Sequence, residues 1–184
     1  MCGICGVVAL NSKPIDTKSI KAMVDVIAHR GPDDAGYLLA QTGTQHPKGY
    51  SFHQAFTDHK FNTVSPMLPE IDSDHGQYEL NKFSWNLFLG HRRLSIIDTS
   101  AAGHQPMSGV SQNQWIVYNG EIYNFQEIKK ELQGIGYTFQ TGTDTEVIIY
   151  SYLEWGIECI NKFNGMFAFA LRDKVQDKFF LVRD

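Results

Sequence analysis

The chain has 184 residues, of which 42% are hydrophobic, with a formal net charge of −4 and three cysteines. This length and composition fit one folded domain and exclude general disorder, and without a Lys/Arg cluster nucleic-acid and anionic-membrane binding are not expected. The odd cysteine number, the lack of an apolar run of roughly 18–20 residues and the lack of a signal-peptide pattern together predict a cytoplasmic protein that spans no membrane.

The first forty residues show strand and helix patterns in turn. A buried strand is expected over Ile4–Leu10, followed by a turn over residues 11–14. Asp16 can cap a helix that runs to about Ala28, because apolar residues then recur at helical spacing. The loop HRGPDD and a second strand, Ala35–Ala40, come next.

Residues 41–84 differ in composition from the rest of the chain. They hold three of its six prolines and four of its seven histidines, and their periodicity is weak. An irregular insertion, partly ordered and mostly on the surface, is therefore predicted, with aromatic residues as its anchors. These aromatic residues are Phe52, Phe56, Phe61 and Tyr78. The histidines His46, His53, His59 and His75 match no compact ligand spacing, so no metal site is expected.

The remaining residues predict strands and helices in runs. The expected strands are Phe83–Leu89, Arg93–Asp98, Gln114–Tyr118, and a hairpin of Met166–Arg172 with Lys178–Val182. One helix should start near Phe125 and stop at Gly136, and a second should follow the capping box that Thr143 opens. A short helical piece is expected near residues 158–163. Because the elements do not alternate strictly, we expect an α+β fold of mostly antiparallel sheets with helices packed outside.

Cys2 narrows the chemistry more than any other residue. Once Met1 is removed, Cys2 carries a thiol nucleophile and a free α-amine, whose reference pKa of about 7.7–8.0 suits a base. Cys2 and Cys5 also spell C-x-x-C, which is typical of redox pairs and zinc sites. In a strand, however, residues three apart point to opposite faces, and the chain offers no further ligands at zinc spacing. Cys5 is therefore expected to be a packing residue.

Several segments accompany the start M-C-G-I in a definite order. They are HRGPD at 29–33, GHRRLSIID at 90–98, YNGEIYN at 118–124, GTDTEV at 142–147, FNGMFAFA at 163–170 and VRD at 182–184. Together they closely resemble the glutaminase domain of B-type asparagine synthetases, which are class II glutamine amidotransferases and N-terminal-nucleophile hydrolases. The resemblance covers the chain except for residues 41–84. It implies one glutaminase domain over residues 1–184 with an αββα four-layer sandwich fold.

The resemblance also implies the catalytic roles. Cys2 matches the nucleophile that attacks the side-chain amide carbon of glutamine, forming a thioester and releasing ammonia. Asn119 and Gly120 match the residues whose side-chain amide and backbone N–H form the oxyanion hole. By itself, Asn119-Gly120 would indicate a turn.

Glutamine is a zwitterion at its α-carbon, so its recognition needs a cation and an anion. Arg93 matches the carboxylate binder, and Asp144, assisted by Glu121, matches the α-ammonium binder. The other implied residues are auxiliary: the backbone near Leu94 and Ile97, and Arg30 of the HRGPD loop. By themselves, Asp144 would indicate a favourable helix start and Arg93 a surface charge.

The resemblance further implies partners. Glutamine hydrolysis needs no cofactor in this domain, whereas ATP and Mg²⁺ are expected for a C-terminal synthetase domain, whose S-G-G-x-D-S loop this chain lacks. Aspartate is the ammonia acceptor that the resemblance implies, and other carboxylates such as sugar acids are alternatives. A homodimer is also possible from the sequence. The alternative is a catalytically inactive domain with a regulatory or interaction role.

Overall fold

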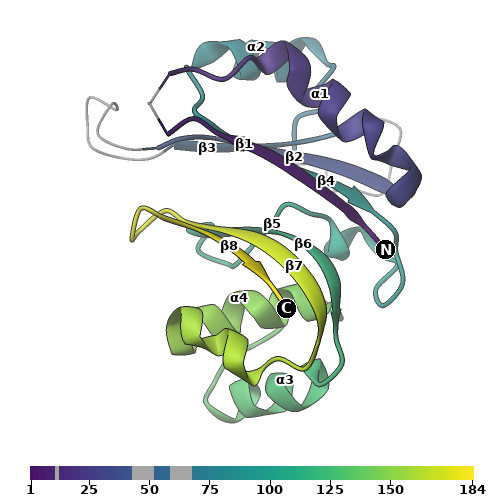
Figure 1. The fold of residues 1–184 in the computed structure, drawn as a ribbon, viewed down its shortest axis with the longest axis vertical. Helices are drawn as coiled ribbons and strands as arrows, with labels where there is room; N and C mark the ends of the chain where they lie inside the picture. The colour runs from purple at the N-terminus through teal and green to yellow at the C-terminus, as the bar shows by residue number, and fades with distance from the viewer. Residues whose placement is uncertain (11–12, 43–51, 59–67) are drawn as a thin grey trace.

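The computed structural model describes residues 1–10, 13–42, 52–58 and 68–184, and within them two sheets face each other between two layers of helices (Figure 1). The first sheet has the order β1 (Gly3–Val8), β4 (Leu87–Arg93), β2 (Asp34–Gln41), β3 (Phe52–Thr57). The second has the order β5 (Met107–Ser108), β6 (Gln114–Ile122), β7 (Gly165–Asp173), β8 (Lys178–Arg183). All paired strands in both sheets are antiparallel. The predicted α+β four-layer sandwich is confirmed.

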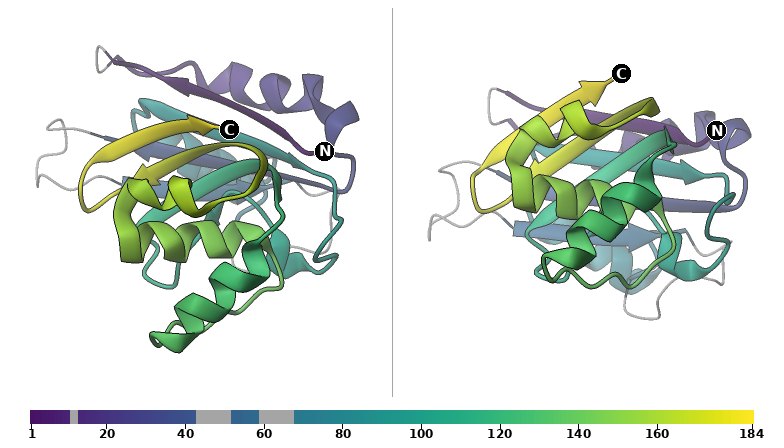
Figure 2. Two further views of the ribbon diagram at one scale, coloured as in Figure 1. Left: turned by 60° about the horizontal axis from the view of Figure 1, so that its bottom comes forward. Right: turned by 90° about the horizontal axis from the view of Figure 1, so that it is seen from below.

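Two helices cover the outer face of each sheet. The first sheet carries α1 (Thr17–Val26) and α2 (Asp74–Lys82), and the second carries α3 (Phe125–Gly134) and α4 (Asp144–Trp155). Figure 2, in the view from below, shows α3 and α4 lying across the second sheet. Three short 3₁₀ helices complete the described structure, at Ala28–Arg30, Ala101–Gly103 and Gly156–Lys162.

The hydrophobic core has one cluster in each space between layers. Val24 and Phe88 belong to the cluster between α1, α2 and the first sheet. Leu89 and Val117 belong to the cluster between the sheets, and Ile148 to the one beneath the second sheet. Burying such a side chain stabilises the fold by about 1.5–3 kcal/mol, so each layer is held by apolar contact with its neighbours.

The starts of α1 and α4 follow local capping signals, as predicted. Asp16 accepts a hydrogen bond from the backbone N–H of Lys18 at 3.1 Å. Thr143 accepts one from the backbone N–H of Glu146 at 3.3 Å. Each satisfies a helix N–H that has no partner inside the helix. The cap at Thr143 places the next residue, Asp144, on the first turn of α4.

The prediction that residues 41–84 are irregular is wrong for β3 and α2. β3 extends the first sheet by pairing with β2, and its Phe56 is fully buried. α2 begins after Ser73, whose hydroxyl accepts from the N–H of Gly76, and it buries Leu80. The high proline and histidine content favoured an irregular structure in the prediction, whereas tertiary contacts stabilise an edge strand and a short helix there.

The sequence also predicts aromatic anchors and no metal site in residues 41–84. Tyr78 is 63% exposed and anchors nothing, while Phe61 and the side chain of Phe52 lie outside the described residues. Within the described residues no three His, Cys, Asp or Glu side chains gather as a metal site would require. The side chains of three of the four histidines in residues 41–84 lie outside that part.

None of the described helices is both long and apolar enough to cross a membrane.

The strands predicted at Phe83–Leu89 and Arg93–Asp98 are also wrong in their bounds. The structure has one strand there, β4, and the chain leaves the sheet after Arg93. Side-chain contacts replace the strand ladder beyond that point: the N–H of Ser95 donates to Asp33 Oδ2, and the Arg93 guanidinium donates to the carbonyl of Asp98. Conversely, β6 continues past its predicted end at Tyr118 to Ile122.

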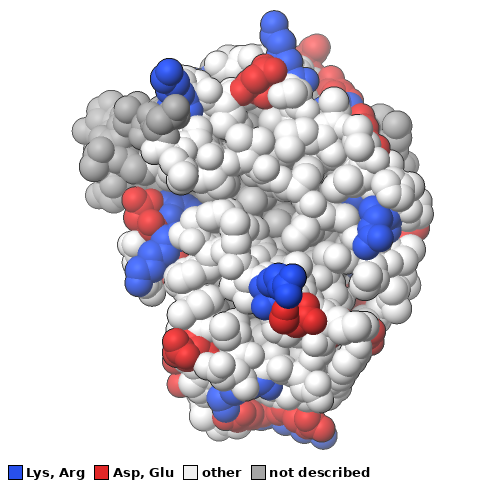
Figure 3. Space-filling model, viewed as in Figure 1, with Lys and Arg blue, Asp and Glu red and all other residues white. Residues whose placement is uncertain are grey.

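The edges of β1 and β8 border an apolar groove between the two sheets. Its volume is about 390 Å³ and its lining includes Ile4, Cys5, Val117 and Leu181. Figure 3 shows that face as mostly uncharged, with basic and acidic side chains scattered around it. Burial raises the pKa of the Cys5 thiol to about 11, which makes it a poor nucleophile at neutral pH.

Candidate active site

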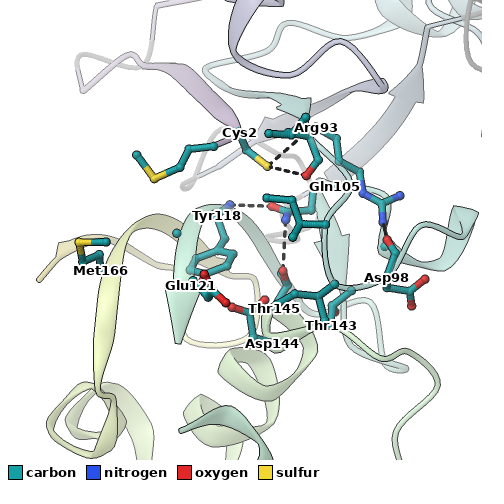
Figure 4. Close-up of a pocket in the computed structure, with 16 residues that line it drawn as sticks. Cys2, Arg93, Asp98, Gln105, Tyr118, Glu121, Thr143, Asp144, Thr145 and Met166 are labelled. Carbon is teal, nitrogen blue, oxygen red and sulfur yellow. Dashed lines mark hydrogen bonds between the residues drawn. The ribbon is translucent and has the colours of Figure 1, made fainter. Parts of the chain in front are cut away.

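A cavity of about 210 Å³ lies where both sheets meet the start of α4 (Figure 4). Its lining comes from five parts of the chain: the N-terminus, the end of β4 with the segment that follows it, strand β6, the start of α4 and Met166 of β7. The predicted site residues in the lining are Cys2, Arg93, Leu94, Ile97, Gly120, Glu121 and Asp144. The predicted residues Asn119 and Arg30 lie beside this set and outside the lining.

Cys2 reaches the cavity because β1 and β4 are antiparallel. Their register pairs Gly3 with Arg92, so the start of β1 lies against the end of β4. The N–H of Leu94 donates to Cys2 Sγ at 3.3 Å, and Sγ lies 3.6 Å from the Leu94 carbonyl oxygen as a donor. Arg30 Nε donates to the Cys2 carbonyl at 3.4 Å. These contacts hold the sulfur at the cavity wall.

Arg93 supplies a positive charge to the same cavity. Its side chain is only 6% exposed, and Nη1 donates to the Ser100 carbonyl at 2.7 Å while Nη2 donates to the Asp98 carbonyl. A guanidinium has five N–H donors, so these two contacts leave donors for a ligand. Arg92 turns the other way and donates to the Gly31 carbonyl.

Asp144 supplies a negative charge from the first turn of α4. It is 4% exposed, and its Oδ2 accepts from the Tyr118 hydroxyl at 2.6 Å and from the N–H of Ile122 at 3.1 Å. Burial raises the pKa of the Asp144 carboxyl above its usual range, and these two donors oppose that rise. Arg93 and Asp144 therefore present opposite charges to one small cavity.

Tyr118 connects the cavity to the space between the sheets. Its N–H donates to Gln105 Oε1 at 2.6 Å, and Gln105 Nε2 donates to Thr145 Oγ1 at 3.2 Å. Its carbonyl oxygen lies 3.1 Å from His91 Nε2. Burial lowers the pKa of His91 to about 3, so the ring is neutral, and because a carbonyl only accepts, Nε2 must carry the proton.

Gly120 and Asn119 sit side by side on β6, with different surroundings. Gly120 lines the cavity, and a Cβ there would lie 2.6 Å from Cα of Phe167 on β7, so the position requires glycine. Asn119 is half-buried, and its Oδ1 is buried without a hydrogen-bond partner in the described part of the chain.

Sequence reasoning missed Tyr118, Gln105 and His91 as parts of the site. Tyr118 enters the sequence analysis only as a strand end and as the first residue of YNGEIYN, although a tyrosine that ends an apolar strand usually needs a partner for its hydroxyl. Nothing local in the sequence marks Gln105, and His91 enters only as a member of GHRRLSIID. Their partners lie 13 and 27 residues away along the chain, across the sheets.

The geometry is that of a particular class of protein. A cysteine at position 2, a guanidinium and a carboxylate line one cavity at the junction of two facing antiparallel sheets, as expected for a glutamine amidotransferase domain. The family model described as "Glutamine amidotransferase domain" matches residues 1–49 and 51–184. The chain belongs to this family.

Its relatives narrow the family further. The chain is 30% identical over its whole length to the Bacillus subtilis protein named asparagine synthetase (glutamine-hydrolyzing) 3, of which it covers 23%. It is 33% identical to the putative asparagine synthetase (glutamine-hydrolyzing) 2 of Methanocaldococcus jannaschii, of which it covers 30%. The chain thus spans less than a third of the length of these relatives, and it is homologous to their glutaminase part.

A solved structure supports the fold independently. The glutamine phosphoribosylpyrophosphate amidotransferase of B. subtilis superposes with a TM-score of 0.69 over all of this chain and 37% of that protein, at 18% identity. At this identity the similarity concerns the fold alone.

Proposed function

We propose that this domain hydrolyses glutamine to glutamate and ammonia, with Cys2 as an N-terminal nucleophile. The observation that carries the proposal is the cavity itself. It brings the Cys2 thiol, the Arg93 guanidinium and the Asp144 carboxylate together, although they come from three distant parts of the chain. A zwitterionic amino acid with a side-chain amide has the three groups that such a cavity can engage.

The reaction begins once Met1 has been removed. The Cys2 α-amine accepts the thiol proton, and the sulfur attacks the γ-amide carbon. The tetrahedral intermediate collapses to a γ-glutamyl thioester as the amine returns the proton to the leaving ammonia. Water, activated by the same amine, then hydrolyses the thioester to glutamate and free thiol.

The oxyanion of each tetrahedral intermediate needs donors beside the sulfur. Gly120 offers a backbone N–H from the cavity wall, and Asn119 offers a side-chain amide from the next position on β6. Removing one donor of this kind typically costs about 2.7–4 kcal/mol of transition-state stabilisation.

Binding of the α-carbon end uses the two charged groups. The N–H groups of Arg93 not engaged by Asp98 and Ser100 donate to the α-carboxylate. Asp144 accepts from the α-ammonium, and Glu121, exposed at the rim, adds negative charge there. The backbone at Leu94 and Ile97 closes the side of the pocket, and Arg30 supports it through the Cys2 carbonyl.

The ammonia would serve a synthetase domain of the kind found in the longer relatives. By their names these relatives are glutamine-hydrolysing asparagine synthetases, so aspartate is the acceptor that we propose for the complete protein. The hydrolysis steps above use only protein groups and water. ATP and Mg²⁺ would be needed to activate the acceptor in the second domain.

Ammonia release from glutamine tests the proposal. Cys2→Ala should lower the rate by roughly a thousandfold or more, because it removes the nucleophile. Cys5→Ala is the matched control, since Cys5 lies on β1 away from the cavity, and it should keep the wild-type rate. Equal rates for Cys2→Ala and wild type would exclude the mechanism. Mass spectrometry of the same samples should show that Met1 is absent.

A further inference from the structure

We propose that Tyr118 is the positioning residue that makes the site specific for an α-amino acid, by fixing the Asp144 carboxylate against the α-ammonium of glutamine. This inference rests on the proposed function. It assigns a task to a hydroxyl group that the mechanism above does not use.

The contact itself is strong. The Tyr118 hydroxyl donates to Asp144 Oδ2 at 2.6 Å, and the two residues are only 3% and 4% exposed, so bulk solvent competes little for either group. Figure 4 shows the tyrosine ring extending from β6 toward Asp144 at the cavity wall. A hydrogen bond to a buried carboxylate is worth more than one between neutral groups.

The carboxylate needs such a partner because its own torsion is soft. The terminal torsion of an aspartate has broad minima, so Asp144 alone could turn its oxygens away from a ligand. The hydroxyl of Tyr118 and the N–H of Ile122 both hold Oδ2 from β6. With one oxygen held twice by protein donors, the orientation of the carboxylate at the cavity is determined.

Tyr118 is itself held firmly enough to serve as a reference point. Its backbone N–H is bound by Gln105 and its carbonyl by His91, so both backbone groups have buried side-chain partners. The strand around it pairs with β7 on one side. The hydroxyl is therefore a rigid donor, and a rigid donor loses little entropy when it orients Asp144.

The chain offers a matched control in Tyr152. This tyrosine is 4% exposed, and its hydroxyl donates to Oδ2 of the buried Asp173 at 2.9 Å, outside the cavity lining. Tyr152→Phe removes the same kind of hydrogen bond from the same kind of pair. Any effect of lost stability should therefore appear in both variants, and any effect on substrate recognition only in Tyr118→Phe.

The experiment compares glutamine with glutaramate, which keeps the γ-amide and the carboxylate but lacks the α-ammonium. Tyr118→Phe should raise KM for glutamine about tenfold with kcat nearly unchanged, and should lower the preference for glutamine over glutaramate by a similar factor. Tyr152→Phe should change neither quantity. An unaltered KM and preference in Tyr118→Phe would overturn the inference.

Asp144→Asn separates this inference from the proposed function. If Asp144→Asn leaves KM for glutamine unchanged, the assignment of the ammonium site fails. If Asp144→Asn raises KM while Tyr118→Phe does not, only the role of Tyr118 fails. If Tyr118 acts through Asp144, the double variant should have the KM of Asp144→Asn, and additive effects would contradict that coupling.

Discussion

Replacing Gly103 with alanine should displace Arg93 and weaken glutamine binding. Gly103 ends the 3₁₀ helix Ala101–Gly103, and its backbone packs directly against the Arg93 guanidinium. A Cβ at Gly103 would lie 2.6 Å from Arg93 Cζ and closer still to Nη2, which is less than real Cβ contacts allow. Either the guanidinium or the short helix must move.

The Arg93 guanidinium can move more easily than the short helix, yet its movement should measurably weaken glutamine binding. Arg93 is 6% exposed and is held by the carbonyls of Asp98 and Ser100, so a shift breaks or lengthens those contacts. It also removes the aligned donors for the α-carboxylate. Loss of a charge-assisted contact of this type is worth about 3 kcal/mol, or roughly a hundredfold in KM.

Steady-state ammonia release gives the relevant numbers. Gly103→Ala should raise KM for glutamine by that factor while kcat falls much less, because Cys2 and Gly120 are untouched. The preference for glutamine over its α-carboxamide should fall too, since that compound lacks the carboxylate. Gly134→Ala is the control: Gly134 is exposed at the end of α3, a Cβ there meets nothing within 4 Å, and KM should be unchanged. A wild-type KM in folded Gly103→Ala would refute the reasoning about Arg93.

Three further predictions concern the same site and its supports. Calorimetry on the Cys2→Ala variant should show that glutamine binding weakens as pH falls. Burial holds the pKa of the Asp144 carboxyl above its usual range, and only the ionised carboxylate pairs with the α-ammonium. Adding Asp144→Asn to this variant should abolish the pH dependence. Thr143→Ala should lower the free energy of unfolding in urea by about 1 kcal/mol, since it removes the cap of α4, and an unchanged midpoint would contradict that role. His91→Leu should raise KM for glutamine several-fold with a smaller effect on kcat, because the Tyr118 carbonyl loses its donor and Tyr118 then holds Asp144 less firmly; a change in kcat alone would argue against this.

The parts of the fold that could be predicted from the sequence are those with local causes. Asp16 and Thr143 cap the helices that follow them because their acceptors lie two or three residues from the donor. The hairpin of β7 and β8 is likewise local, with a short turn between two apolar runs. Such signals depend on only a few neighbouring residues, so they can be recognised in the sequence before the tertiary contacts are known.

The errors fall where long-range contacts decide the outcome. β3 is a strand because β2 lies beside it, and the chain turns out of β4 after Arg93 because Asp33 and Asp98 offer side-chain and carbonyl partners there. Apolar residues after Arg93 favour a strand when considered alone, yet Ile96 is 68% exposed in the structure. Strand propensity depends on the surroundings of a segment, and the segment after Arg93 lies at the rim of the cavity, where no strand of the described residues pairs with it.

The sequence alone predicts the type of chemistry. Cys2 behind a removable methionine, together with the ordered motifs, resembles an amidotransferase nucleophile, and the role that we propose for Cys2 rests on that resemblance. The contacts between these groups, in contrast, depend on the folded structure. Cys2 lies against Leu94, and Tyr118 against Asp144, because antiparallel sheet register and the packing of α4 bring together residues 92 and 26 positions apart. Those contacts depend on burial and on partners far along the chain, and no local pattern of side chains encodes them.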